Sequence, residues 1–377
     1  FYGQMTYKRM FGTFVNNAWL PDVFGNSWIL PQILKKSGVD YFVSNKMSTW
    51  NDTNRFPHNN FIWRGIDGSE VLACVPPTHF ITWNAPSQIQ ENWEAYIDKD
   101  LGGQTMNMFG YGDGGSGCTE EMIELMHRFD KLSIMPKCEH MGGAEFLEKN
   151  LKGNKNLEVW DGELYLEMHR GTFTTKSNLK RINRRLEYKF RTAEVLCVMK
   201  NEDKQDKIDE LYKKFLVNQF HDIIPGSHIH PVYEDAIKDY EYIEAELDKI
   251  IGTGSKYFNT LNFERKSLTF VPNKNGSSYR LGVRGNWLIP SIPPLKAKSL
   301  RATKSTDDWF IFENGKIETP FYSAMLNSDG SFASLFDKEL KREWTKGEFN
   351  KLKIYSDTPG NYDAWDILPN YKDKEID

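Results

Sequence analysis

Two aspartates stand out in the sequence because turn-forming residues surround each of them. Asp22 lies in the stretch Pro-Asp-Val-Phe-Gly, directly before a helical pattern, and Asp113 lies in the stretch Gly-Tyr-Gly-Asp-Gly-Gly-Ser-Gly. Glycines let the backbone approach a ligand closely, so we expect Asp113 to face open space. A pair of carboxylates can cleave a glycosidic bond, with one acting as nucleophile or base and the other as proton donor. An aspartate at this position can also cap the start of the following helix, so the sequence leaves the role of Asp22 open.

A histidine and an aspartate follow the second of three apolar helical runs. His221 and Asp222 lie in the stretch Gln-Phe-His-Asp-Ile-Ile-Pro-Gly, and the pattern places them at the end of that helix. A histidine there can simply bind the last carbonyl groups of the helix, and Asp222 can cap the next turn. His221 and Asp22 are also nitrogen and oxygen ligands of the kind that zinc takes. Two ligands alone do not define a metal site.

The composition excludes several classes of protein. The 377 residues carry a formal net charge of -4, so we expect no partner among nucleic acids or membranes. No apolar run reaches the roughly 18 residues that cross a bilayer. The glycine-rich loop at Asp113 lacks the Lys-Ser/Thr of a nucleotide-binding P-loop. The four cysteines are far apart and form no Cys-x-x-Cys pair, which indicates a reducing compartment and predicts a cytoplasmic location.

The first 165 residues alternate short apolar runs with helical patterns, which is typical of an α/β domain with a largely parallel sheet. The patterns predict strands at 40–44, 71–75 and 106–112, and helices at 28–37 and 119–130. Functional loops in such a domain follow the carboxyl ends of the strands. The sequence therefore predicts an α/β catalytic domain over residues 1–165, incomplete at its amino end.

The hydrophobic period changes twice in the rest of the chain. Apolar stripes over 179–196, 208–216 and 232–247 predict a three-helix bundle within residues 166–252. After Gly252-Thr253-Gly254-Ser255, short runs at 268–271, 279–281, 309–312 and 332–336, the last preceded by a hairpin signal at 327–331, predict antiparallel strands. We interpret residues 253–377 as the start of a β-sandwich domain. The predicted fold class is thus α/β plus all-α plus all-β.

Six motifs together resemble the family 38 glycoside hydrolases, which are α-mannosidases. They are the stretches Trp19–Gln32, Asn54–Pro77, Gly110–Gly117, Glu163–Thr174, Gln219–Ser227 and Tyr362–Ile367, in the order of the family. The resemblance implies zinc-assisted hydrolysis of α-mannosidic bonds in oligosaccharides or glycans, with a retaining mechanism. It implies that Asp22 is both nucleophile and zinc ligand, that Asp113 is the acid/base, and that His221 is a zinc ligand. It further implies sugar contacts from Phe24, Lys46, Asp222 and Tyr362. A homo-oligomer is compatible with the sequence.

The sequence also departs from the family pattern. The family carries a His-x-Asp pair of zinc ligands near its amino end, and no His-x-Asp occurs here. We therefore expect an internal portion of a larger enzyme, without two zinc ligands and the first strand. Ser116, Cys118 and the stretch Thr78–Ile81 also differ from the family pattern, which leaves the substrate or linkage preference open. The alternative is a carbohydrate-binding fragment without turnover. A metal-dependent deacetylase on a related scaffold is a further alternative, but that function would leave the Asp113 loop unexplained.

Overall fold

The computed structural model describes residues 1–113, 115–129, 131–252, 256–276, 278–280, 282–300, 310–347, 349–358 and 360–376. The chain divides into two compact units, each built from stretches that are far apart in the sequence. The first unit comprises Phe1–Ser177, Gln219–Ile229 and Asn361–Ile367, and the second comprises Asn178–Asn218, His230–Gly360 and Leu368–Asp377. The predicted domain boundaries after residues 165 and 252 stay a prediction.

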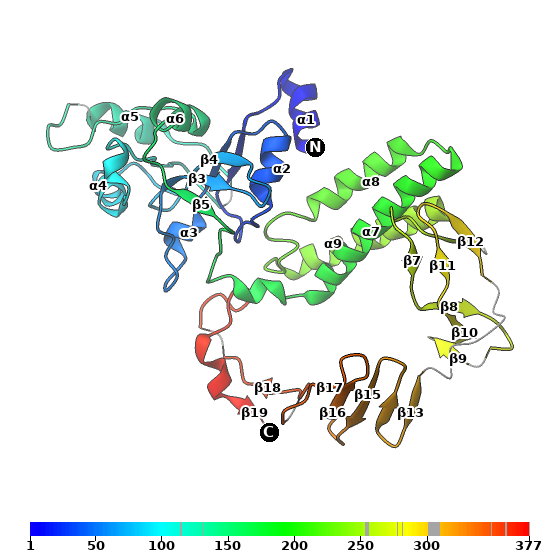
Figure 1. Cartoon of the computed structure of the whole chain (residues 1–377). Coiled ribbons are helices and arrows are strands. Elements are labelled where there is room, and N and C mark those ends of the chain that lie inside the picture. Colours follow the sequence, from blue (N-terminus) through cyan, green and yellow to red (C-terminus); the bar gives the residue numbers. More distant parts are fainter. Residues whose placement is uncertain are drawn as a thin grey trace. The chain divides into compact units, whose positions relative to one another are not determined.

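A five-stranded sheet runs through the described part of the first unit (Figure 1). Its strands are β1 (Asn17–Leu20), β2 (Tyr41–Ser44), β3 (Asn60–Arg64), β4 (Glu70–Cys74) and β5 (Val159–Asp161), in the order β1-β2-β4-β3-β5. β1 pairs with β2, β2 with β4, and β3 with β5 in parallel, whereas β3 and β4 are antiparallel. The sheet is therefore mostly parallel, as the alternation of strand and helix patterns predicts.

Two helices pack on this sheet and bury the side chains of its opposite faces. α2 (Leu30–Lys36) contacts β3 and β4, and α6 (Gly143–Asn150) contacts β2 and β4. Phe42 of β2 packs in one apolar core with Leu34 of α2, whereas Val43 packs in another with Leu147 of α6. Successive strand residues point to opposite faces, so β2 contributes to both cores. The other helices of this unit are α1 (Tyr2–Phe11), α3 (Lys46–Thr49), α4 (Pro86–Ala95) and α5 (Glu120–Phe129).

Residues 106–112 do not form the strand that their apolar alternation predicts. Met106 and Met108 are buried in the core beside α6, so the alternation itself is present. Their carbonyl groups, however, accept hydrogen bonds from side chains. Asn92 Nδ2 donates to Met106 O at 3.1 Å, and Thr82 Oγ1 donates to Met108 O at 2.6 Å. These side chains satisfy backbone groups that a neighbouring strand would otherwise pair with.

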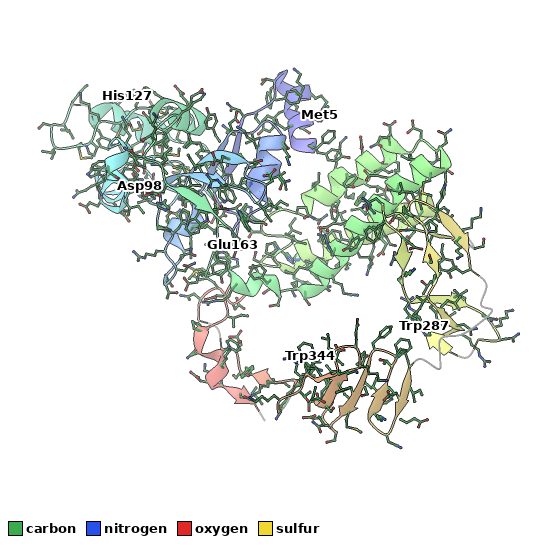
Figure 2. All side chains as sticks on the ribbon, viewed as in Figure 1. Met5, Asp98, His127, Glu163, Trp287 and Trp344 are labelled. Atoms are coloured by element: carbon green, nitrogen blue, oxygen red, sulfur yellow. The ribbon has the colours of Figure 1, made fainter. Side chains whose placement is uncertain are left out.

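Glu167 is a buried carboxylate in the segment after β5 that includes Glu163 (Figure 2). It accepts hydrogen bonds from Thr53 N at 3.0 Å, Thr53 Oγ1 at 2.6 Å and Asn54 N at 2.7 Å. In return, Asn51 Oδ1 accepts a bond from the Glu167 N–H at 2.7 Å. The Thr53 hydroxyl lowers the pKa of Glu167, burial raises it, and the backbone donors lower it further, so that it lies below its ordinary value.

We expect Glu167→Gln to lower the free energy of unfolding by about 1–3 kcal/mol at neutral pH, because the amide has one acceptor oxygen and buries an unmatched NH2 group. The folded pKa lies below the unfolded value of about 4.3, so the wild-type contribution is complete above that pH. It is lost as the pH falls through the folded pKa. Denaturant titrations at pH 7 and pH 3 should show a smaller difference at pH 3. An equal difference at both pH values would contradict this account.

Three long helices lie almost wholly in the second unit, namely α7 (Ser177–Lys200), α8 (Gln205–Val217) and α9 (His230–Ile251). Most residues of the predicted stripes are buried, whereas Leu216 of the second stripe is 42% exposed. Phe190 of α7 stacks on Tyr212 of α8 with ring centroids 4.0 Å apart. Arg185 of α7 forms two hydrogen bonds with Glu244 of α9, at 2.8 and 2.6 Å. A separate three-helix bundle domain stays a prediction.

α8 ends at Val217, before His221, so the prediction that His221 lies at the end of this helix is wrong. Asn218 accounts for the early end. Its backbone N–H and its side-chain amide both donate to carbonyl groups of the last turn, the amide to Lys214 O at 3.2 Å. These are the groups that a helix terminus leaves unpaired. His221 follows in a series of hydrogen-bonded turns that belong to the first unit.

Antiparallel strands make up much of the second unit, as the sequence predicts. They are β6 (Lys256–Phe258), β7 (Arg265–Lys266), β8 (Thr269–Pro272), β9 (Ser278–Arg280), β10 (Val283–Leu288), β11 (Ser291–Ile292), β12 (Ala297–Ser299), β13 (Ile311–Glu313), β14 (Lys316–Glu318), β15 (Tyr322–Leu326), β16 (Phe332–Asp337), β17 (Arg342–Glu343), β18 (Ile354–Tyr355) and β19 (Glu375–Ile376). The hairpin at 327–331 connects β15 and β16. Residues 253–255, Leu281 and Trp309 lie outside the described residues. The β-sandwich stays a prediction.

Candidate active site

A pocket of about 250 Å³ lies in the first unit, where the chain leaves β1 and β2. All of its lining residues belong to that unit, although they come from three separate stretches of the chain. They are Asp22, Lys46, Trp50, His79, Phe80, Asp113, Asp222, Tyr362 and Trp365. The pocket therefore brings together both candidate acids and three of the candidate sugar contacts, namely Lys46, Asp222 and Tyr362.

Asp22 and Lys46 meet because they follow neighbouring parallel strands. Leu20, the last residue of β1, is paired with Ser44, the last residue of β2, and Ser44 Oγ donates to Leu20 O at 2.9 Å. The turn after β1 depends on Gly25, which has a φ of 94°. A Cβ atom there would also approach Leu164 O to 3.0 Å. The tight turn and the aligned strand ends set Asp22 beside Lys46.

Lys46 forms an ion pair with Asp22, and the lysine side chain is almost inaccessible to solvent. Its Nζ lies 2.6 Å from Asp22 Oδ1, and the lysine side chain is 4% exposed. The same ammonium group lies 5.2, 5.1 and 4.9 Å from the ring centroids of Phe24, Trp50 and Trp365. Aromatic faces attract a cation, so these rings offset part of the cost of burying the charge. Phe24, a candidate sugar contact, thus packs against the cation instead of lining the pocket.

His221 contacts the other oxygen of Asp22. Its Nε2 lies 3.2 Å from Asp22 Oδ2 and 3.8 Å from Asp222 Oδ2. Burial raises the pKa of Asp22, but hydrogen bonds from His221 and Lys46 and the Lys46 charge outweigh that effect, so the pKa lies below its ordinary value. Asp22 is therefore an ionised carboxylate whose two oxygens are held by two different partners.

Asp113 reaches the pocket on a loop that packs closely against the segment after β4. A Cβ atom on Gly112 would meet the Ile81 side chain at 2.3 Å and Phe80 at 3.0 Å, so a larger residue would displace these side chains. The loop begins at Gly110, whose N–H donates to Thr82 O at 2.9 Å. The glycines predicted to give Asp113 room therefore allow close packing on one side of the loop.

Sequence reasoning missed an aromatic wall behind Asp22. His169 is 1% exposed, stacks on Trp365 with ring centroids 4.4 Å apart, and contacts Phe24 at 4.3 Å. Burial, and then the Lys46 charge, lower the pKa of His169 to about 3, so it is neutral. Trp50 lies edge-on to both Trp365 and His169. His169 and Trp365 lie inside motifs that the sequence analysis singled out, whereas Trp50 carries no comparable signal.

The segment at Tyr362 belongs to a turn, although it lies within the range predicted to begin a β domain. Tyr362 has a φ of 67°, and its carbonyl accepts the N–H groups of Trp365 and Asp366. The turn is held by Arg170, whose Nε lies 2.9 Å from Asp366 Oδ1, and by Gly171 N, which donates to Trp365 O at 2.7 Å. These bonds place the rings of Tyr362 and Trp365 at the pocket.

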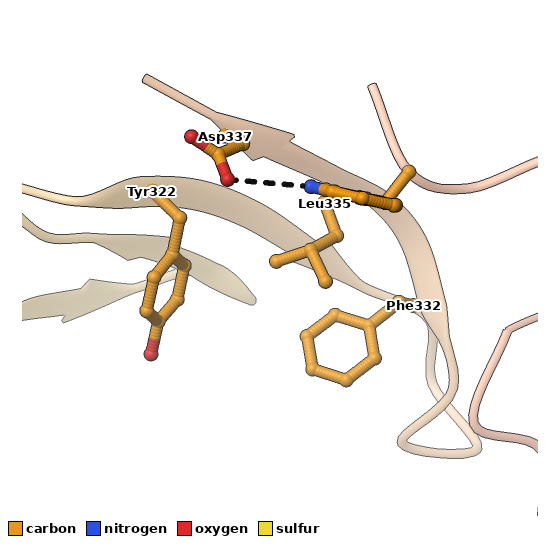
Figure 3. Close-up of a pocket in the computed structure, with 5 residues that line it drawn as sticks. Tyr322, Phe332, Leu335 and Asp337 are labelled. Carbon is orange, nitrogen blue, oxygen red and sulfur yellow. Dashed lines mark hydrogen bonds between the residues drawn. The ribbon is translucent and has the colours of Figure 1, made fainter. Parts of the chain in front are cut away.

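Another pocket, of about 320 Å³, lies in the second unit beside β15 and β16 (Figure 3). Its lining residues are Tyr322, Phe332, Leu335, Asp337 and Trp344. Asp337 accepts a hydrogen bond from Trp344 Nε1 at 3.4 Å. This lining offers a single carboxylate and no basic group, so it does not supply the pair of acids that glycosidic cleavage requires.

Asp22 and His221 provide atoms of the kinds that zinc binds, but two ligands are fewer than a zinc site usually has. A zinc site usually has four ligands drawn from Cys, His, Asp, Glu and water. Within the described ranges, no three such side chains come together in a way that could hold a metal. Asp22 Oδ1 is also occupied by the Lys46 ammonium group. The described residues thus form part of a zinc shell and do not complete it.

Comparisons with known proteins identify the family of the chain. Family models match residues 1–163 (glycosyl hydrolases family 38 N-terminal domain), 167–258 (alpha mannosidase middle domain) and 317–377 (glycosyl hydrolases family 38 C-terminal domain). Alpha-mannosidase G of Dictyostelium discoideum is 31% identical over 97% of this chain and 40% of that protein. Alpha-mannosidase of Saccharomyces cerevisiae is 30% identical over 97% of this chain and 35% of its own length. The chain thus spans about two fifths or less of these relatives.

Solved structures share the fold. The crystal structure of an alpha-mannosidase from Enterococcus faecalis V583 matches 96% of this chain and 52% of its own, with a TM-score of 0.70 and 13% identity. A second Enterococcus faecalis structure, a protein in the glycosyl hydrolase family 38, matches with a TM-score of 0.56 and 14% identity. Since three domain models match in chain order over most of the sequence, the chain belongs to the glycosyl hydrolases of family 38.

Proposed function

We propose that the protein hydrolyses α-mannosidic bonds in mannose-containing oligosaccharides or glycans by a zinc-assisted retaining mechanism. The observation that carries the proposal is the meeting of Asp22 and Asp113 at one pocket, from loops that lie far apart in the sequence. The names of the relatives support the substrate class, because they are alpha-mannosidases. The chain covers only a fraction of the length of these relatives, so the proposal concerns the activity of the whole protein.

The surroundings of Asp22 support a division of roles between the two carboxylates. Asp22 is ionised and held by Lys46 and His221, so it suits attack on the anomeric carbon. In the first step a bond forms between an Asp22 oxygen and that carbon, the glycosidic bond breaks, and Asp113 gives its proton to the leaving oxygen. In the second step Asp113 takes a proton from water, whose oxygen displaces Asp22 from the anomeric carbon. Two inversions give net retention.

Other residues of the pocket orient the sugar. Tyr362 and Trp365 are stacked on one another with centroids 5.0 Å apart, and they present apolar faces that suit a sugar ring. Asp222 is half exposed and can accept sugar hydroxyl groups. A zinc ion held in part by Asp22 and His221, with further ligands from outside the described residues, would supply positive charge beside the sugar hydroxyls.

We expect the full-length protein to release the aglycone from an aryl α-mannoside and to lose at least about nine tenths of this activity after treatment with a chelator. Zinc should restore the activity, because Asp22 and His221 would bind the ion again and leave coordination positions open for the substrate. The measurement is the initial rate before chelation, after it, and after zinc is added back. Activity on the corresponding β-mannoside serves as the control for anomer specificity. Hydrolysis that is indifferent to the chelator would remove zinc from the proposal.

The small number of metal ligands among the described residues favours a second candidate function. Because the described residues provide an incomplete shell, a protein that binds mannose-containing glycans without turnover is compatible with the same pocket. The two candidates differ in product. Calorimetric binding of a mannose oligosaccharide by the full-length protein, without any release of mannose after long incubation with zinc, would favour the binding protein.

A further inference from the structure

The stretch Thr78–Ile81, which departs from the family pattern, lies at the same edge of the sheet as the candidate nucleophile. β1, β2 and β4 are adjacent and parallel, so their carboxyl ends meet at one edge. Asp22 follows the first of these strands and Lys46 the second. His79 follows β4, and it lines the same pocket. Its position is therefore set by the same architecture that sets the nucleophile.

Hydrogen bonds hold this stretch firmly in place. The fully buried Asn45, just after β2, donates from Nδ2 to Thr78 O at 2.7 Å. Asn92 of α4 donates from Nδ2 to Thr78 Oγ1 at 2.8 Å. A buried amide is costly to leave without a partner, so these bonds favour one position of Thr78. Thr78, directly before His79, is thus held by amides from two different segments.

The same stretch supports the loop of the candidate acid. Gly112 packs against Phe80 and Ile81, and Gly110 donates to Thr82. His79 stacks on Phe80 with ring centroids 4.6 Å apart and an interplanar angle of 21°. His79 is thus connected to the Asp113 loop through Phe80, and it also lies edge-on to Trp50, which packs against Lys46.

The imidazole of His79 presents one defined hydrogen-bond donor. Its Nδ1 accepts the N–H of Ile81 at 3.1 Å, so the proton of the neutral ring is on Nε2. Burial lowers the pKa of His79 and the Lys46 charge lowers it further, while Asp22 and Asp113 act in the opposite direction. Among the described residues no hydrogen bond to Nε2 is formed. A neutral donor at the pocket is thus left for a ligand.

We propose that His79 determines specificity on the leaving-group side of the pocket, where Nε2–H donates a hydrogen bond to a hydroxyl of the sugar that leaves. This inference rests on the proposed function, because it assigns a further role at the same site. Asp113 has to reach the glycosidic oxygen. Side chains of the segment that supports its loop are therefore placed beside the sugar on the leaving-group side of that oxygen. A sugar leaving group carries hydroxyls that can accept this bond, and a simple aryl leaving group does not.

The test compares wild type, His79→Phe and His79→Gln in the full-length protein, with α-linked mannobioses and an aryl α-mannoside as substrates. Phenylalanine keeps the ring that stacks on Phe80 but lacks both the Nε2 donor and the Nδ1 acceptor of the Ile81 N–H, and glutamine restores a donor and an acceptor. We expect His79→Phe to raise KM for the best mannobiose by about two- to tenfold, the usual worth of one neutral hydrogen bond, with kcat nearly unchanged. The aryl mannoside should keep its KM, and His79→Gln should recover part of the loss.

The exposed His127 on α5 provides a matched control, because His127→Phe makes the same change away from the pocket (Figure 2). It should leave both substrates unaffected. Equal losses of His79→Phe on both substrates would show that His79 only supports the acid loop, and no loss would show that it has no role; both results overturn the inference. A wild-type protein that hydrolyses neither substrate would overturn the proposed function and this inference together. Hydrolysis of the aryl mannoside with no effect of His79→Phe on the mannobiose overturns this inference alone.

Discussion

Asp22→Asn should lower kcat for α-mannoside hydrolysis by about 10³-fold or more in the full-length protein. An amide is a poor nucleophile, so the covalent step that splits the reaction into two easier ones is lost. Steady-state rates on an aryl α-mannoside, measured with zinc present, give the effect. A variant that keeps a tenth of the wild-type kcat would show that Asp22 is not the nucleophile.

The same substitution should also destabilise the protein, because it leaves the Lys46 ammonium group without its carboxylate. The lysine side chain is 4% exposed, and removing one partner of a buried pair costs about 3–5 kcal/mol. Asp235→Asn is the matched control, since it breaks an Asp–Lys pair with Lys238 whose side chains are 75% and 71% exposed. Exposed pairs contribute little. Equal unfolding midpoints for the two variants would contradict a structural role for the Lys46–Asp22 pair.

Asp113→Asn is expected to have the second largest effect, and one that depends on the leaving group. General acid catalysis contributes about 10²- to 10⁴-fold, so hydrolysis of a mannobiose should fall by that factor. An aryl mannoside with a strongly acidic phenol needs little protonation, and its first step should be far less affected. The comparison of single-turnover and steady-state rates on both substrates measures this difference.

Asparagine at position 113 should also make the second step slow, because water loses its base. A burst of phenol followed by slow turnover is then expected with the activated aryl mannoside. Equal losses on both substrates, without a burst, would assign Asp113 a positional role and leave the acid unidentified. Substitution of the exposed Asp100 by asparagine, away from the pocket lining, provides the control.

The parts of the site that could be predicted from sequence are those with local causes. Asp22 is placed by a turn that proline and glycine encode, and the glycines around Asp113 give a loop that can pack closely. The parallel arrangement of β1 and β2 follows from the alternation of strands and helices. Aligned strand ends then bring Asp22 next to Lys46, a pairing that the chemistry of the motif alone does not predict.

The parts that could not be predicted depend on partners far away along the chain. Met106 and Met108 alternate as a strand does, but side chains take their carbonyl groups. The helix before His221 ends early at Asn218, whose side-chain amide also donates to Asp239 Oδ2 of α9 at 3.2 Å. Trp365 faces the Asp22 cluster only because its turn is bound to the segment at Arg170 and Gly171, and hydrophobic periodicity carries no information on such a pairing.

The return of residues 361–367 to the first unit has a consequence for biosynthesis. The α/β unit contains Asp22 and Asp113, but the rings of Tyr362 and Trp365 reach the ribosome exit about 140 residues after Asp222, which takes on the order of ten seconds at the usual rate of translation. During that interval the nascent chain contains Asp22, but the aromatic rings beside Lys46 are not yet all present. Phe24 and Trp50 therefore lack the ring of Trp365 as a partner until that part of the chain has been synthesised.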